Sequence, residues 1–224
     1  MNCIRVEKPR QFAMSAAKHI YEKYIHAIEQ HGCFTFVLSG GNTPQHIFDV
    51  LVKDYMAMID WKKVHVFWLD ERCVGFDHDD SNYKLAFDHL LKYMDVGAVY
   101  RMEGELEPND AAMKYENMLT SYFHLKEGGL PVFDLILLGM GEDGHCASIF
   151  PGSDEMWEKS RLVVSTQRQY NGYKRISLTL PVINNSGKVL LIGNGVKKSV
   201  FMDRDKRLPI HMINTYGLTV IERS

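Results

Sequence analysis

The sequence is poor in the features that mark secreted, membrane and nucleic-acid-binding proteins. It has only four cysteines among 224 residues, without CxxC spacing or the density of a secreted scaffold, so we expect reduced thiols. The longest aliphatic stretch, around residues 135–138, is far too short to span a bilayer. With 26 basic and 28 acidic residues the formal net charge is −2, which provides no field to gather nucleic acid.

Processing and linker signals are also missing. Residues 1–9 carry charges and a proline where a signal peptide would need an apolar run, so we expect a cytoplasmic protein. The seven prolines are scattered, and no repeat or low-complexity tract marks a linker. A chain of this length, 46% hydrophobic, can bury a large core, and we predict a single domain over residues 1–224.

What is present is an alternation of strand and helix patterns. Apolar residues at helical spacing predict a helix over 10–31, followed by a short β-prone run at 33–38. Thr43 and Pro44 then resemble an N-cap and a first helical residue. Further strands are predicted at 64–69, 133–138, 161–166, 175–180, 188–192 and 217–222, and further helices after Ser81, after Asn109 or Asp110, and from about Val196. This alternation predicts an α/β fold with a mainly parallel sheet and helices on both faces.

In such folds the reactive loops follow the carboxyl ends of the strands, and four of these ends carry polar or glycine-rich sequence. The first is Ser39 to Thr43. Gly40 and Gly41 would let backbone amides approach a ligand, and the N-terminus of the helix that follows favours an anion such as a sugar phosphate. An ordinary strand-to-helix turn is the alternative.

The second strand end is Asp70-Glu71-Arg72, which we expect to be a loop. Three consecutive charges after an apolar strand are costly unless they pair or bind something. Arg72 could hold a phosphate or carboxylate through two parallel hydrogen bonds, and Asp70 and Glu71 could hold Arg72 or a sugar hydroxyl. A solvated loop with a local ion pair is the alternative.

The third strand end, Gly139 to His145, formally matches the G-x-G-x-x-G dinucleotide fingerprint. Pro151-Gly152 would interrupt the long helix that this fingerprint requires, so we do not expect a nicotinamide enzyme. The glycine-rich turn instead presents His145, which can move protons near neutral pH, with Asp143 to orient it. A nucleophilic role for Cys146 is less favoured, because adjacency along the chain does not place a base on the thiol.

Two further cations lie at strand ends. Arg175 begins a predicted strand, and Lys197 lies in the first turn of a predicted helix after Gly193-Asn194-Gly195. A lysine is unfavourable at a helix N-terminus unless an anion is bound there. Both are therefore candidate phosphate ligands, with solvated surface charge as the alternative. We predict no metal site, because Asp77 to Asp80 is explained as a polar loop before the Ser81 cap.

Together these stretches resemble the 6-phosphogluconolactonase family. The matching runs are LSGGNTP (38–44), WLDERCV (68–74), SNYKLAF (81–87), FDLILLGMGEDGHCASIFPGS (133–153), RISLTLPVIN (175–184) and GNGVKKSVF (193–201). The resemblance implies a Rossmann-like open, twisted sheet. It also implies hydrolysis of 6-phospho-D-glucono-1,5-lactone in the oxidative pentose phosphate pathway, without a cofactor. We expect a monomer or small homo-oligomer.

By position, the resemblance makes His145 the catalytic base and Asp143 its partner. Arg72, Arg175 and the Ser39–Thr43 loop correspond to the family's substrate-binding segments. Cys146 and Ile149 stand where threonine and leucine are common, and residues 218–224 lack the family's usual aspartate-alanine ending, so we expect small effects on packing or on the rim of the site.

Two rival functions remain. An amino-sugar-phosphate isomerase-deaminase has a similar SGG-TP loop, but that family carries asparagine before Gly-His and an F-N-E-P run afterwards, where this chain has Asp143 and residues 148–151 SIFP. A non-catalytic sugar-phosphate sensor would bind the ligand without turnover. The intact pair of Asp143 and His145 argues against a sensor.

Overall fold

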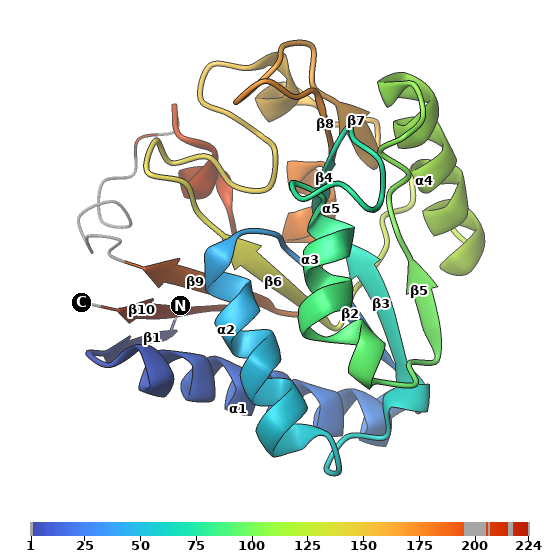
Figure 1. Ribbon diagram of the computed structural model, residues 1–224. Coiled ribbons are helices and arrows are strands. Elements are labelled where there is room, and N and C mark those ends of the chain that lie inside the picture. The colour runs from blue at the N-terminus through green and yellow to red at the C-terminus, as the bar shows by residue number, and fades with distance from the viewer. Residues whose placement is uncertain (1, 195–204, 206, 215–216, 224) are drawn as a thin grey trace.

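The computed structural model describes residues 2–194, 205, 207–214 and 217–223. A seven-stranded sheet forms its centre, in the order β1-β10-β9-β6-β2-β3-β5, and every pairing in it is parallel (Figure 1). Its strands are β1 (Asn2–Val6), β2 (Phe34–Leu38), β3 (Val64–Trp68), β5 (Ala98–Tyr100), β6 (Leu135–Gly139), β9 (Val189–Asn194) and β10 (Leu218–Arg223). The predicted parallel α/β sheet is confirmed, while β1 and β5 were not predicted.

Helices cover both faces of this sheet. They are α1 (Pro9–His31), α2 (Asn42–Val50), α3 (Asn82–His89), α4 (Pro108–Tyr122) and α5 (Leu180–Asn184), with shorter helical turns at Leu51–Tyr55, Trp61–Lys63, Leu91–Tyr93, Asp154–Trp157 and Pro209–Met212. Phe67 packs on Tyr122 of α4, whereas the next residue, Trp68, packs on Tyr83 of α3. Successive residues of a strand point to opposite faces, so α3 and α4 lie on opposite sides of the sheet. No helix in the described ranges is long and apolar enough to cross a bilayer.

A second, antiparallel sheet was not predicted. It contains three strands in the order β4-β8-β7, namely β4 (Asp70–Arg72), β7 (Val163–Ser165) and β8 (Arg175–Leu178). The expectation of a loop at 70–72 is therefore wrong. The β4 backbone pairs with β8, a strand more than a hundred residues later in the chain, and a local sequence pattern does not encode such a partner.

The helix ends agree only in part with the sequence signals. Ser81 caps α3 as predicted, because its hydroxyl accepts a hydrogen bond from the Lys84 amide at 3.2 Å. Glu107, and not Asn109 or Asp110, caps α4: its carboxylate accepts from both of those amides. Likewise α2 begins one residue before Thr43, and Gly41 occupies its N-cap position without a side-chain cap.

The strand order determines where the chemistry can occur. The chain builds β2, β3 and β5 outward to one side, then crosses back to place β6, β9 and β10 on the other side of β2. Since β6, β2 and β3 are neighbours and parallel, the segments that follow their carboxyl ends meet at one edge. Such a reversal of strand order is where open α/β sheets form their ligand sites.

Candidate active site

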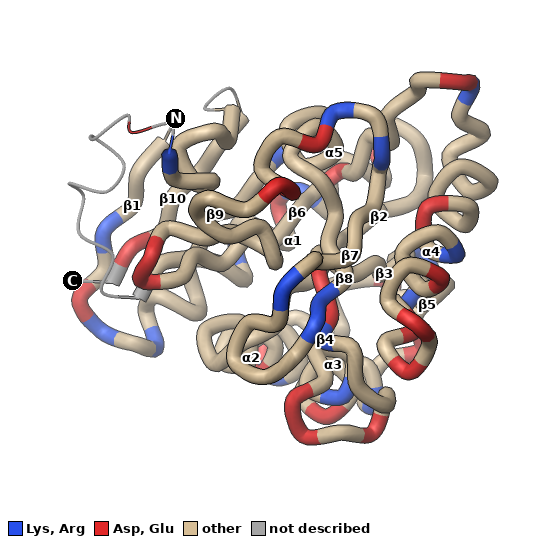
Figure 2. The backbone as a smooth tube through the Cα atoms, turned by 90° about the horizontal axis from the view of Figure 1, so that it is seen from above, with Lys and Arg blue, Asp and Glu red and all other residues tan. Residues whose placement is uncertain are grey.

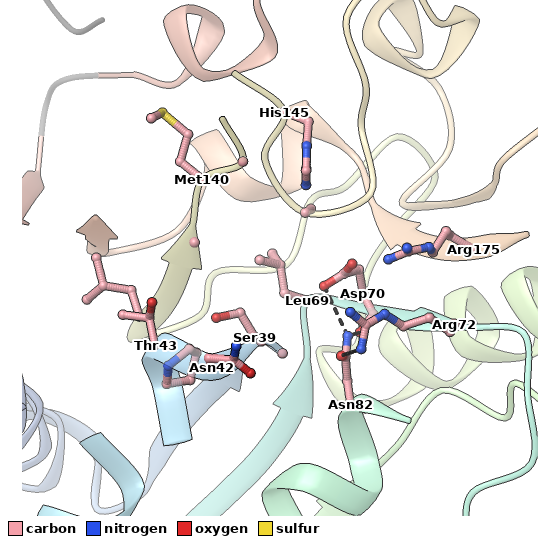
Figure 3. Close-up of a pocket in the computed structure, with 17 residues that line it drawn as sticks. Ser39, Asn42, Thr43, Leu69, Asp70, Arg72, Asn82, Met140, His145 and Arg175 are labelled. Carbon is pink, nitrogen blue, oxygen red and sulfur yellow. Dashed lines mark hydrogen bonds between the residues drawn. The ribbon is translucent and has the colours of Figure 1, made fainter. Parts of the chain in front are cut away.

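A cavity of about 390 Å³ opens at this edge (Figure 3). It brings together segments that lie far apart in the sequence: the ends of β2 and β6, the strands β4 and β8, and the start of α3. The residues that line it are Ser39, Gly40, Gly41, Asn42, Thr43, Pro44, Leu69, Asp70, Arg72, Asn82, Gly139, Met140, Gly141, His145, Ala147, Arg175 and Ile192. All the site residues predicted from the sequence are in this set except Asp143, which contacts His145, and Lys197, which lies outside the described residues.

The loop between β2 and α2 forms one wall. Gly41 has a φ of +95°, a conformation that glycine adopts without the strain of a Cβ, and it leads directly into the first turn of α2. No side chain caps that turn, so its amides are free for an anion. Ser39 is only 5% exposed, and its Oγ has no hydrogen-bond partner among the described residues. A buried hydroxyl without a partner on a cavity wall is suited to bind a polar ligand atom.

Glu71 has a structural role that the sequence did not reveal. Its carboxylate accepts hydrogen bonds from the amides of Arg72, Asn82 and Tyr83 at 2.7–2.8 Å and from the Ser81 hydroxyl at 3.0 Å. Burial raises the pKa of this carboxyl to about 7, although these four hydrogen bonds oppose the shift. Glu71 therefore anchors the start of α3 to β4 and leaves Asp70 and Arg72 to face the cavity.

We expect Glu71→Gln to destabilise the fold. The glutamine amide nitrogen would face two hydrogen-bond donors that now have an acceptor, at a cost of about 1–3 kcal/mol in the free energy of unfolding. Urea denaturation at pH 8, where the wild-type carboxylate is ionised, measures this. Glu127→Gln, at an exposed position, is the matched control and should change stability by less than about 0.5 kcal/mol. Equal stability of the two variants would contradict the anchoring role.

Two arginines face the cavity without a carboxylate partner. Arg72 and Arg175 are directly opposite each other on β4 and β8, and Figure 2 shows the basic positions of these strands side by side near α2 and α3. Within the part of the chain that the structure describes, no carboxylate lies within 4.0 Å of either guanidinium. Burial, opposed in part by Asp70 and reinforced by the positive charge of Arg72, lowers the pKa of Arg175. A pair of neighbouring, unneutralised guanidinium groups favours a multiply charged anion.

Both arginines are held by neutral oxygens. Arg72 Nη1 donates to the Asp80 carbonyl at 2.8 Å and to Asn82 Oδ1 at 2.6 Å. Arg175 Nη2 donates to the Tyr170 carbonyl at 3.3 Å, while its buried Nε has no partner among the described residues. These contacts fix the side chains without cancelling their charge.

The glycine-rich segment after β6 forms a tight hairpin. The Gly141 amide donates to the His145 carbonyl at 2.9 Å, and the Gly144 amide donates to the Gly141 carbonyl at 3.0 Å. Gly144 has a φ of +83°, which accounts for the glycine there. No long helix follows: the next elements are the single turn at Asp154–Trp157 and then β7. The dinucleotide fingerprint therefore lacks the helix that would bind a pyrophosphate, as the sequence predicted.

His145 is oriented within this hairpin by Asp143. The Nδ1 atom of His145 lies 2.6 Å from Asp143 Oδ1, which also accepts from the His145 amide at 3.1 Å. Burial by itself would raise the pKa of the Asp143 carboxyl, but the hydrogen bonds and the charge of His145 outweigh it and lower that pKa. An ionised carboxylate at Nδ1 keeps the proton there and leaves Nε2 as the basic nitrogen. The imidazole points into the cavity (Figure 3).

Close packing also holds the imidazole. One face of the ring contacts Phe150, at 4.6 Å between ring centroids, and Phe150 stacks on Tyr170. On the hairpin itself, a Cβ built on Gly141 would overlap Cε1 and Nδ1 of His145. Glycine at position 141 is therefore a steric requirement for this position of the ring.

The neighbouring Cys146 is unsuited to nucleophilic chemistry. It is buried, does not line the cavity, and burial raises the pKa of its thiol to about 12. In the described ranges, no cluster of three or more histidine, cysteine, aspartate or glutamate side chains could hold a metal ion. Among the described residues, His145, Asp143, Asp70 and the two arginines are therefore the candidates for the chemistry of the cavity.

Sequence reasoning missed two polar residues that organise the site. Ser148 donates to Asp70 Oδ2 at 2.6 Å, and Asn82 contacts both Asp70 and Arg72. Ser148 lies in the family-like run 133–153 and Asn82 in SNYKLAF (81–87), so the resemblance had already marked both segments as matching the family. Their roles were not visible, because their partners are distant in the sequence or paired with another strand.

Comparison with known proteins agrees with this architecture. A family described as glucosamine-6-phosphate isomerases/6-phosphogluconolactonase matches residues 7–221. The chain is 39% identical over 198 residues to the rice (Oryza sativa subsp. indica) protein named "Probable 6-phosphogluconolactonase 4, chloroplastic". The aligned region covers 84% of this chain but only 60% of the rice protein. It is 38% identical over 175 residues to the Synechocystis 6-phosphogluconolactonase, covering 77% of this chain and 71% of that protein.

The structural match extends over nearly the whole chain. The crystal structure of 6-phosphogluconolactonase from Thermotoga maritima superposes with a TM-score of 0.85 at 28% identity, covering 99% of this chain and 98% of the other. A 6-phosphogluconolactonase from Shewanella baltica gives a TM-score of 0.86 at 27% identity.

Proposed function

This chain belongs to the family of glucosamine-6-phosphate isomerases and 6-phosphogluconolactonases, and within that family we propose that it is a lactonase. Its substrate would be 6-phospho-D-glucono-1,5-lactone, which it would hydrolyse to 6-phosphogluconate in the oxidative pentose phosphate pathway. One observation carries the proposal: the cavity combines a histidine oriented by a carboxylate with two arginines that have no carboxylate partner. The first can activate water and the second can bind a phosphate.

The proposed reaction begins at His145. Because Asp143 accepts the proton on Nδ1, Nε2 can take a proton from a water molecule, whose oxygen attacks the lactone carbonyl carbon C1. Backbone amides of the glycine loop, together with an arginine, would stabilise the oxyanion. When the intermediate collapses, the bond from C1 to the ring oxygen breaks and Nε2 returns its proton to that oxygen. The product is the open-chain acid, and the imidazole is neutral again.

The phosphate would determine where the carbonyl lies. We propose that Arg72, Arg175, Lys197 and the amides of Gly40 to Thr43 bind it, and that Asp70 binds a sugar hydroxyl. A phosphate held at one end of the cavity fixes C1 beside His145 and lowers the entropic cost of the attack. No step in this sequence needs a cofactor. Cytoplasmic location and a monomeric or small homo-oligomeric state stay predictions.

A lactonase assay tests this function directly. The purified chain is added to freshly generated 6-phosphogluconolactone, and disappearance of the lactone is followed against its spontaneous hydrolysis. We expect a large enzymatic excess over that background, and no ammonia release from glucosamine 6-phosphate. Ammonia release would indicate the isomerase-deaminase reaction instead. Tight binding of the product without turnover would indicate a sugar-phosphate sensor.

A further inference from the structure

Asp70 and Arg72 present an unusual arrangement of opposite charges. They are two residues apart on β4, so their side chains leave the strand on the same face, and both line the cavity. In a partly dry site, such a pair is expected to form a direct ion pair. It does not: the two groups are not within 4.0 Å of each other, and the Asn82 carboxamide lies between them (Figure 3).

The Asn82 carboxamide matches both neighbours. Its Oδ1 accepts from Arg72 Nη1 at 2.6 Å, and its Nδ2 donates to the Asp70 carbonyl at 2.8 Å and to Asp70 Oδ1 at 3.4 Å. A neutral amide with an acceptor at one end and a donor at the other can satisfy a cation and an anion together without neutralising either. Ser148 holds the other oxygen of Asp70 at 2.6 Å.

Asn82 itself cannot move away easily. It is the first residue of α3 and only 2% exposed, and its amide donates to Glu71 Oε1 at 2.7 Å. Its carboxamide also packs against Gly40, where a Cβ would overlap Oδ1. The residue therefore connects three parts of the site: the loop after β2, the strand β4 and the helix α3.

We propose that Asn82 is a positioning residue that acts as a spacer: it prevents Asp70 from neutralising Arg72, so that the guanidinium stays available for the anionic group of the ligand. With Asn82 truncated, Arg72 would swing onto Asp70 and close an internal ion pair. The site would then lose a phosphate ligand although both charged residues are still present. The identification of that anionic group as the substrate phosphate rests on the proposed function.

A double-mutant cycle tests the spacer. Binding of 6-phosphogluconate and of inorganic phosphate is measured by calorimetry for Asn82→Ala, Asp70→Asn and the double variant. We expect Asn82→Ala to weaken binding about tenfold in the wild-type background. In the lactonase assay, the same variant should raise KM more than it lowers kcat. In the Asp70→Asn background the same truncation should cost less than about threefold, because no carboxylate is left to capture Arg72. Equal losses in both backgrounds would overturn the proposal.

Asn82→Asp provides a second, nearly isosteric test that keeps the packing against Gly40. Its carboxylate would itself pair with Arg72, so we expect weaker phosphate binding than in Asn82→Ala and no recovery when Asp70→Asn is added. Wild-type affinity in Asn82→Asp would overturn the spacer role. Thermal denaturation of each variant identifies any loss of folding. Because the readout is binding, a failure of the spacer is distinguishable from a failure of lactone turnover in the wild type.

Discussion

His145→Ala is expected to lower kcat for lactone hydrolysis at least about a hundredfold, with a much smaller change in KM. His145 is the only histidine on the wall of the cavity in the described structure. Its Nδ1 is hydrogen-bonded to Asp143, and its Nε2 has no hydrogen-bond partner among the described residues. Loss of a well-placed general base costs about 10²–10⁴ in rate. The arginines and the loop after β2 are untouched by this change, so ligand binding should persist.

The measurement compares kcat with the spontaneous hydrolysis of the lactone at the same pH, since a slow variant can fall below that background. His26→Ala, at an exposed position on α1, is the matched control and should retain the wild-type rate. Asp143→Asn should lower kcat less than His145→Ala, because the asparagine can still accept the hydrogen bond but lacks the charge that stabilises the imidazolium. Wild-type kcat in His145→Ala would exclude His145 as the base.

Gly141→Ala is expected to produce a loss of kcat close to that of His145→Ala, although it removes no chemical group. The added Cβ would occupy the space of His145 Cε1 and Nδ1 and would lie 2.9 Å from Asp143 Oδ1. The imidazole must therefore leave its position, and an error of about 1 Å in such a site costs on the order of a hundredfold. The backbone of Gly141 has no positive φ, so alanine should not strain the hairpin itself.

Gly139→Ala is the matched comparison for this variant. Gly139 is two residues earlier, at the end of β6, and a Cβ there would meet no atom within 4 Å. Its kcat should fall far less than that of Gly141→Ala, and circular dichroism should show both variants folded. If Gly141→Ala retains wild-type kcat, the hairpin does not depend on this close approach, and the position of the imidazole is not sterically fixed.

Much of the fold was predictable because its signals are local. The central strands β2, β3, β6 and β9 are short apolar runs, and helices such as α1 carry their periodicity in consecutive residues. The contact between Asp143 and His145 was also within reach, since the two residues are separated by a single glycine in one hairpin. Patterns of this kind depend on neighbours along the chain, which the sequence lists in order.

Two errors in the sequence-based prediction have different causes. Residues 70–72 look like a charged loop, yet they form a strand because β8 supplies their hydrogen bonds. Asparagine and aspartate dominate N-caps, so the sequence favours Asn109 or Asp110 as the cap of α4, whereas the longer Glu107 side chain reaches the amides of both residues. In the first case the deciding partner is distant in the sequence. In the second it is local, but glutamate is not among the residue types that usually cap helices.

By itself the sequence indicated the candidate chemical groups: a histidine with its carboxylate, two arginines and a glycine loop. All of these except Arg175, which begins its strand, follow the carboxyl end of a β-prone run. Only the tertiary structure decided how these groups act together. Asp70 binds Ser148 across 78 positions, Arg72 lies opposite Arg175 across two strands, and Asn82 separates Asp70 from Arg72. Such contacts depend on the order of strands in a folded sheet, so they exist only once the chain has brought distant segments to the same edge.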